Sequence, residues 1–258
     1  MGPAPVPGRD IRHAPRDPPD DRAPMNRVHG WLEQARRHAP LLVLGVALLL
    51  LWSPIVSMVV FALADATYVL YASVGIGSLR RETPRPREEA ERRWKRFASR
   101  AGWLMDVACV SFVALSIVTH DTLPWPWPRW TAIALALVLG AIGLGTKAWA
   151  AMVIPRENYF WHDIFFPEKA GHFSRAGPYR WLANPMYTFG YAHTYGLGIL
   201  TLSLPTLVGA AFAQSLILLF NAFVERPAGA RRAQAVATAA PVALGRVPAS
   251  ARAPAEPA

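Results

Sequence analysis

The chain has 258 residues, of which 53% are hydrophobic and only 17% are charged. Its formal net charge is +10, a value that would suit a nucleic-acid-binding protein. The basic residues, however, flank long apolar stretches, as they do in membrane proteins, so nucleic acid is excluded as a partner. A soluble fold is also excluded, because the apolar stretches lack the amphipathic period of a globular core.

Four apolar stretches carry almost no charge, and they cover residues 41–78, 101–120, 130–153 and 186–224. About 20 apolar residues in a helix span the hydrocarbon core of a bilayer. Inside hydrocarbon every backbone polar group must be hydrogen-bonded within the segment, so these stretches are expected to be helical. The sequence therefore predicts an all-α integral membrane protein.

Two of these stretches, 41–78 and 186–224, are each about twice as long as one membrane span. Each has a proline near its middle, Pro54 in WSPIV and Pro205 in LSLPT. Both stretches are therefore predicted to be helical hairpins, which gives about six transmembrane helices. The number falls to four or five if 41–78 is a single tilted span.

The basic residues indicate the orientation in the membrane. All of the 27 Lys and Arg residues except Arg129 and Lys147 fall in segments 1–40, 79–100, 154–185 and 225–258. Basic segments stay on the cytoplasmic side, so we expect both termini to be cytoplasmic and the chain to lie in the inner membrane of the cell. The segment 121–129 then becomes the main outer loop, and its tryptophans suit the membrane interface.

The chain is expected to form one membrane domain, residues 41–227, between two tails. Both tails, 1–40 and 228–258, are rich in Pro, Ala and Arg and are expected to be disordered. The single cysteine, Cys109, excludes an intramolecular disulfide. No His, Cys and Asp cluster has the spacing of metal ligands, so no metal is expected.

The loop 154–185 is rich in aromatic residues, His and Arg, which is unusual for a simple connection between spans. Near its end, Gly177-Pro178-Tyr179-Arg180 predicts a tight turn. Asn184 and Pro185 then suit the N-cap and first residue of the next helix, which is also all that a well-built helix start requires. A hairpin brings its two ends together, so this loop and Glu225 should meet at the cytoplasmic membrane surface.

Four motifs follow one another in this half of the chain: GPYRWLANPMY, YAHTYGLGIL, LSLPT and FVERP. In this order they resemble the phospholipid methyltransferase family, integral membrane enzymes that methylate phosphatidylethanolamine. The wider superfamily includes the isoprenylcysteine carboxyl methyltransferases. The resemblance covers residues 130–227, and it implies S-adenosyl-L-methionine as the methyl donor and a lipid-like methyl acceptor taken from the membrane lipids.

The resemblance also implies the residues of the donor site. They come from a Gly-x-Gly element, the Gly-Pro-aromatic-Arg turn, the Asn-Pro-x-Tyr element and the end of the last helix. In this sequence they are Gly143, Leu144, Gly145, Gly177, Pro178, Tyr179, Arg180, Asn184, Pro185, Tyr187, Glu225 and Arg226. The family commonly has two adjacent acidic residues at the last position, whereas here Arg226 follows Glu225; an arginine suits a phosphate or the carboxylate of the donor. The Gly-x-Gly element alone is also explained by close helix packing.

His193 and Tyr187 are the candidate catalytic residues. His193 lies within an apolar span, where an ionisable residue is a functional candidate by default. It either removes a proton from an amine substrate or makes a hydrogen bond to a neighbouring helix. Asp65 is also ionisable and lies within a span, but the sequence offers it no partner.

Three functions remain open at this point. The first is N-methylation of a phosphatidylethanolamine-type phospholipid. The second is methylation of another acceptor by an enzyme of the same superfamily, either an isoprenylcysteine carboxylate or a small thiol. The third is a non-catalytic membrane protein that keeps the fold.

Overall fold

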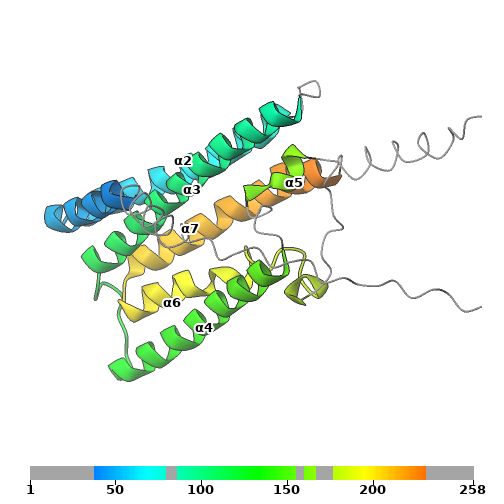
Figure 1. The fold of residues 1–258 in the computed structure, drawn as a ribbon. Helices are drawn as coiled ribbons and strands as arrows, with labels where there is room; N and C mark the ends of the chain where they lie inside the picture. Colours follow the sequence, from blue (N-terminus) through cyan, green and yellow to red (C-terminus); the bar gives the residue numbers. More distant parts are fainter. Residues whose placement is uncertain (1–37, 80–85, 155–159, 167–176, 231–258) are drawn as a thin grey trace, which may run out of the picture. The chain divides into compact units, whose positions relative to one another are not determined.

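The structure is a computed structural model that describes residues 38–79, 86–154, 160–166 and 177–230. The tails expected to be disordered therefore lie largely outside the described residues. The regular elements in the described part of the chain are all helical (Figure 1). The labelled elements are α2 (Pro54–Ser78), α3 (Arg87–Val118), α4 (Arg129–Val153), α5 (His162–Phe165), η4 (Gly177–Arg180), η5 (Phe189–Tyr191), α6 (Ala192–Leu200), α7 (Leu204–Phe220) and η6 (Asn221–Glu225).

Among the described residues, four helices are long and apolar enough to cross a bilayer: α2, α3, α4 and the continuous helix Leu204–Ala230, which includes α7 and η6. This confirms the predicted all-α membrane fold, with a number of spans in the expected range of four to six. The first arms of the two hairpins are shorter. One is the apolar helix His38–Leu51, and the other is α6, which has 9 residues.

The two prolines begin helices through the same local arrangement. Ser53 precedes Pro54, and its side chain accepts a hydrogen bond from the backbone N–H of Val56. Ser203 likewise accepts from the N–H of Thr206, at 3.1 Å. A serine N-cap followed by proline in the first turn favours the start of a helix. Each long apolar stretch is therefore two helices joined by a short turn.

One end of the helices, here called the turn end, holds both of these turns and the loop between α3 and α4. The backbone N–H of Asp121 donates to the carbonyl of Thr201, at 2.9 Å. The hydroxyl groups of Thr119 and Ser203 are 2.5 Å apart, and both residues are buried. These bonds tie the 119–128 loop to the turn between α6 and α7.

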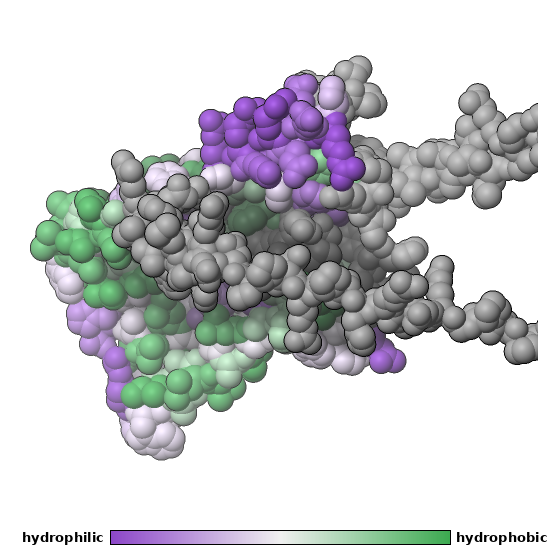
Figure 2. All heavy atoms as spheres, in the orientation of Figure 1, coloured by the Kyte–Doolittle hydropathy of each residue, from purple (hydrophilic) through white to green (hydrophobic). Residues whose placement is uncertain are grey.

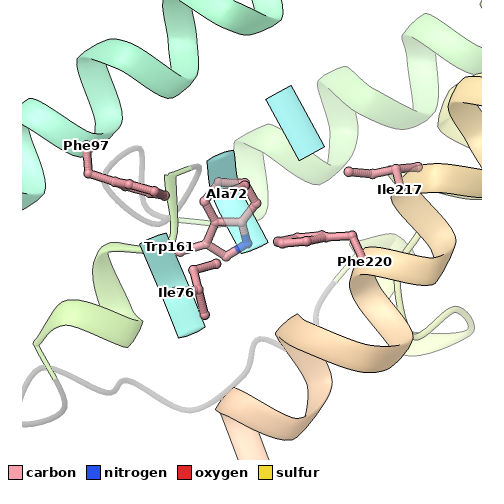
Figure 3. Close-up of a cluster of buried hydrophobic side chains, with 6 residues drawn as sticks. All are labelled: Ala72, Ile76, Phe97, Trp161, Ile217 and Phe220. Atoms are coloured by element: carbon pink, nitrogen blue, oxygen red, sulfur yellow. The ribbon is translucent and has the colours of Figure 1, made fainter. Parts of the chain in front are cut away.

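The opposite end, here called the loop end, holds a cluster of buried hydrophobic side chains from α2, α3, α7 and the described part of the 154–185 loop (Figure 3). Trp161 of the loop lies in the middle of this cluster, and its ring centre is 5.3 Å from that of Phe220. The full cluster comprises Ala72, Ile76, Phe97, Trp161, Ile217 and Phe220. The loop is thus packed into the helices at residues 160–166.

The helices pack in two groups around α7. Helix α2 packs against α3, and α4 packs against α6, while α7 contacts both α2 and α6 (Figure 1). Figure 2 shows hydrophilic residues gathered over the start of α3, whereas hydrophobic residues dominate the surface along α4. Helices α3 and α4 make little direct contact with each other, which leaves room for a cavity between them.

Candidate active site

A cavity of about 700 Å³ lies among α2, α3, α4, α6 and α7 and reaches the loops of the loop end. Its walls along α3 and α4 are mostly apolar, with Phe112 and Leu137 among the lining residues. Polar side chains line it at the loop end, where Tyr187 and Glu225 lie. A volume of this size is typical of small-molecule sites, which combine apolar walls with a few placed polar groups.

Glu225 reaches the cavity because the last helix changes its winding just before it. Residues Asn221–Glu225 form a π-helical turn. In a regular α-helix, Glu225 would point about 80° away from Ile217, which lines the cavity about two turns earlier in the same helix. The wide turn takes up one extra residue and reduces that angle to about 20°. Such turns are frequent at functional sites, because they redirect a side chain without breaking the helix.

The carboxylate of Glu225 is held by two hydrogen bonds from other elements. The hydroxyl of Tyr187 and the indole N–H of Trp161 both donate to it. Its Oε2 atom is buried and has no hydrogen-bond partner among the described residues. A buried acceptor without a partner is costly, so this atom is suited to a ligand that donates a hydrogen bond.

Burial raises the pKa of the Tyr187 hydroxyl well above its ordinary value, and the nearby charge of Glu225 raises it further. The phenol therefore keeps its proton around neutral pH. This favours Tyr187 as a hydrogen-bond donor that orients Glu225, and it disfavours Tyr187 as a general base.

The backbone around Tyr187 is fixed by Gln214 of α7. The side-chain amide of Gln214 donates to the carbonyls of Tyr187 and Thr188, at 3.1 and 3.2 Å. Its oxygen accepts a hydrogen bond from the hydroxyl of Tyr195, at 2.7 Å. Gln214 thus connects the Asn-Pro-x-Tyr element to the helix that carries Glu225.

The predicted helix start at Asn184 and Pro185 is wrong. Residues 184–188 form turns, a short 3-10 segment follows, and α6 begins only at Ala192. The physical reason lies in the carbonyls of Tyr187 and Thr188. Both accept from the side-chain amide of Gln214, and the carbonyl of Thr188 also accepts from the N–H of Tyr191 in the 3-10 segment. Pro185 is fully buried beneath these turns, and Asn184 lines the cavity.

His193 lies in α6 and lines the cavity. Its Nδ1 atom is 2.6 Å from the carbonyl oxygen of Gly190. A carbonyl oxygen can only accept, so Nδ1 carries the hydrogen and the neutral ring keeps its lone pair on Nε2. This arrangement gives His193 the electronic form of a general base on the cavity wall.

The three residues of the Gly-x-Gly element lie in different environments. Gly143 is buried, and a Cβ atom there would overlap the backbone of His193. Leu144 lines the cavity. A Cβ atom at Gly145 would meet no heavy atom of the described residues within 4 Å, and this residue does not line the cavity. Gly143 therefore lets α4 and α6 approach closely, and a contact of this element with the methyl donor stays a prediction.

The remaining candidate residues for the donor site also differ in whether they line the cavity. Tyr179 lines the cavity, whereas Pro178 is buried and Arg180 and Arg226 are exposed outside it. Gly177 has a φ of 57°, a left-handed backbone that favours glycine and shapes the turn before Tyr179. The candidates that the structure brings to the cavity are Leu144, Tyr179, Asn184, Tyr187, His193 and Glu225.

Two residues that hold the site were not recognised in the sequence, Trp161 and Gln214. The tryptophan lies in a loop whose aromatic density did signal a folded segment. Gln214 is an uncharged polar residue within an apolar span, and such residues commonly bond between membrane helices. That polar character was the only available signal, because its partners lie more than 18 residues away in the chain.

The helices and the site together define a polytopic helical membrane protein with a polar site at one end and an apolar cavity beside it. Residues 131–232 match the phospholipid methyltransferase family. The predicted resemblance to this family is thereby confirmed for that segment, which contains α4, α6, α7 and every residue proposed for the donor site.

Several curated relatives carry the name phosphatidylethanolamine N-methyltransferase. The protein from Phaeosphaeria nodorum is 33% identical over 145 residues, which cover 55% of this chain and 15% of that relative. The Saccharomyces cerevisiae protein is 27% identical over 119 residues, covering 45% of this chain and 14% of that relative. The matched region is thus a small part of each relative. No solved structure matches this chain.

Proposed function

We propose that this protein is an S-adenosyl-L-methionine-dependent methyltransferase that N-methylates a phosphatidylethanolamine-type phospholipid at the cytoplasmic face of the inner membrane, with both termini cytoplasmic. The observation that carries the proposal is the buried Oε2 atom of Glu225, which lacks a partner among the described residues and borders the cavity. Glu225 Oε2 would accept a hydrogen bond from a ribose hydroxyl or from the ammonium of the bound donor. The family match and the names of the relatives support the reaction class.

The donor, when bound, supplies a methyl group on a sulfonium. The residues around the cavity bind and orient the two substrates and exclude water, which is most of what an in-line methyl transfer requires. Tyr187 and Trp161 hold Glu225 against the donor, and Tyr179 and Tyr191 offer aromatic faces to a cation, at about 0.5–2 kcal/mol each. His193 takes the proton that the acceptor amine must lose.

An apolar cavity beside the donor site suits a lipid substrate. The walls contributed by α3 and α4 receive acyl or glycerol groups, since these helices make little direct contact with each other. The same walls suit an isoprenylcysteine carboxylate, so the apolar surface alone does not choose between these acceptors. A small thiol needs no such surface.

The experiment is a lipid profile of cells that express the protein and otherwise lack this methylation. We expect mono-, di- or trimethylated phosphatidylethanolamine to appear in the extracts. A control strain should express Glu225→Gln at the same level. Identical lipid profiles in the two strains, with unmodified phosphatidylethanolamine only, would contradict the proposed acceptor.

A further inference from the structure

The cavity continues beyond Glu225 along helix α2, where Phe61, Asp65 and Tyr68 line it. These residues are spaced by three and four positions, so they lie on one face of the helix. Helix α2 reaches the loop end at Ser78, and Asp65 lies about 20 Å from that residue along the helix axis. An acidic residue at this depth is expensive to keep in a membrane protein, and such residues usually serve a function.

No described Lys or Arg residue forms an ion pair with the carboxylate of Asp65. The side chain is only 7% exposed, and its Oδ2 atom has no hydrogen-bond partner among the described residues. No ion pair joins it to Lys147, the basic residue that also lines the cavity. A purely structural carboxylate would be bonded by neighbouring helices, because a buried charge without partners costs several kcal/mol.

Aromatic residues lie on both sides of Asp65 along this face of α2. Phe61 lies one turn before Asp65 and packs against Phe112 of α3, with ring centres 5.0 Å apart. Tyr68 lies one turn after it and also lines the cavity. A carboxylate among aromatic faces favours an alkylammonium group, from a primary amine to a quaternary one.

A charge of the opposite sign faces the same cavity from α4. The Nζ atom of Lys147 lies 5.2 Å from the ring centre of Tyr191. Lys147, Cys109 of α3 and Asp65 all line this cavity. The two charges are thus in one cavity without neutralising each other directly. A head group that carries an ammonium and a phosphate would complement both.

We infer that Asp65 binds the ammonium group of the methyl acceptor and that Lys147 binds its phosphate. This inference rests on the proposed function and deepens it, because it explains why the acceptor is an amine. A carboxylate acceptor would be repelled by Asp65, whereas a phosphatidylethanolamine head group is attracted at both of its charges. Glu225 then binds the methyl donor and Asp65 binds the methyl acceptor, in two parts of one cavity.

The test uses the full chain purified in mixed micelles, with labelled S-adenosyl-L-methionine and phosphatidylethanolamine. The variants are Asp65→Asn, which keeps the shape of the side chain, and Thr67→Val, on the exposed face of α2. We expect Asp65→Asn to raise the KM for the lipid at least about tenfold. The affinity for the donor and the melting temperature should stay unchanged, and Thr67→Val should behave as the unsubstituted protein. An unchanged lipid KM in Asp65→Asn would overturn the inference, and so would a loss of donor affinity and stability together.

A second measurement does not depend on activity. Phosphatidylcholine should raise the melting temperature of the unsubstituted protein more than phosphatidylglycerol, which has no ammonium group. Asp65→Asn should remove this difference, and Lys147→Met should weaken the effect of both lipids. If the difference between the lipids persists in Asp65→Asn, Asp65 does not bind the ammonium. If the shifts occur as expected but no methyl group is transferred, the lipid site stands and the proposed function fails.

Discussion

Glu225 connects the proposed donor site to the packing of the loop end. Its carboxylate accepts hydrogen bonds from Tyr187 and Trp161, and its buried Oε2 atom is left for a ligand. Removal of the whole side chain would leave the Tyr187 hydroxyl and the Trp161 indole N–H without an acceptor. A loss of ligand binding could then not be separated from a loss of stability. The substitution Glu225→Gln avoids this, because the amide oxygen still accepts while the amide nitrogen replaces the acceptor that the ligand needs.

We therefore expect Glu225→Gln to weaken binding of S-adenosyl-L-methionine roughly ten- to a hundredfold, the usual result of losing a charged hydrogen-bond partner. The melting temperature should change little. Isothermal calorimetry on the purified protein measures the affinity, and Arg226→Gln, at an exposed position, is the matched control. Equal donor affinity in Glu225→Gln and the unsubstituted protein would remove this residue from the donor site.

The two glycines of the Gly-x-Gly element should respond differently to alanine. A Cβ atom at residue 143 overlaps the backbone of His193, so Gly143→Ala should force α4 and α6 apart and destabilise the fold by about 1–3 kcal/mol. Gly145→Ala should leave the melting temperature unchanged, because nothing described lies within 4 Å of its Cβ. Both variants should also be titrated with the donor. A loss of donor affinity at residue 145 with intact stability would contradict the packing interpretation of this element.

At the scale of elements, the π-helical turn Asn221–Glu225 determines the direction in which Glu225, and with it the proposed donor site, faces. Inserting one alanine after Ala222, an exposed residue, should turn Glu225 by about 100° away from the cavity and reduce donor binding as strongly as Glu225→Gln does. Deleting Ala222 is the control. It converts the wide turn into a regular one and leaves Glu225 within about 20° of the direction of Ile217, so binding should survive. The account of this turn fails if both length variants bind the donor equally well.

The parts of the fold that follow from local chemistry could be predicted from the sequence. Apolar length predicted the long helices, and Pro54 and Pro205 predicted the observed breaks, where Ser53 and Ser203 cap the helices that follow. The start of α6 could not be predicted locally, because it depends on Gln214. The side-chain amide of this residue donates hydrogen bonds to two carbonyls that lie 26 and 27 residues earlier in the chain. The π-helical turn has no sequence signal either. At the site, motif resemblance indicated Tyr187 and Glu225, but it gave no indication of the supporting Trp161.

At the scale of the whole molecule, the two ends of the helices should lie on opposite sides of the membrane. The turn end carries Asp121 and Arg129, which form an ion pair at 2.6 Å, and the loop end carries the basic start of α3. Reporter fusions after residue 258 should report a cytoplasmic location, and an insertion within 121–129 an external one. A cytoplasmic signal from the 121–129 loop would contradict this orientation.

The central claim is that the loop-end cavity transfers a methyl group from S-adenosyl-L-methionine to a phospholipid amine. The most direct measurement is methyl transfer by the purified protein, with labelled donor and vesicles of phosphatidylethanolamine, followed by separation of the lipids. The account predicts label in N-methylated phosphatidylethanolamine, at a rate that falls strongly in Glu225→Gln and in His193→Ala. Two results would contradict it. The first is a folded protein that binds the donor but labels no lipid, and the second is labelling of the vesicles that neither substitution reduces.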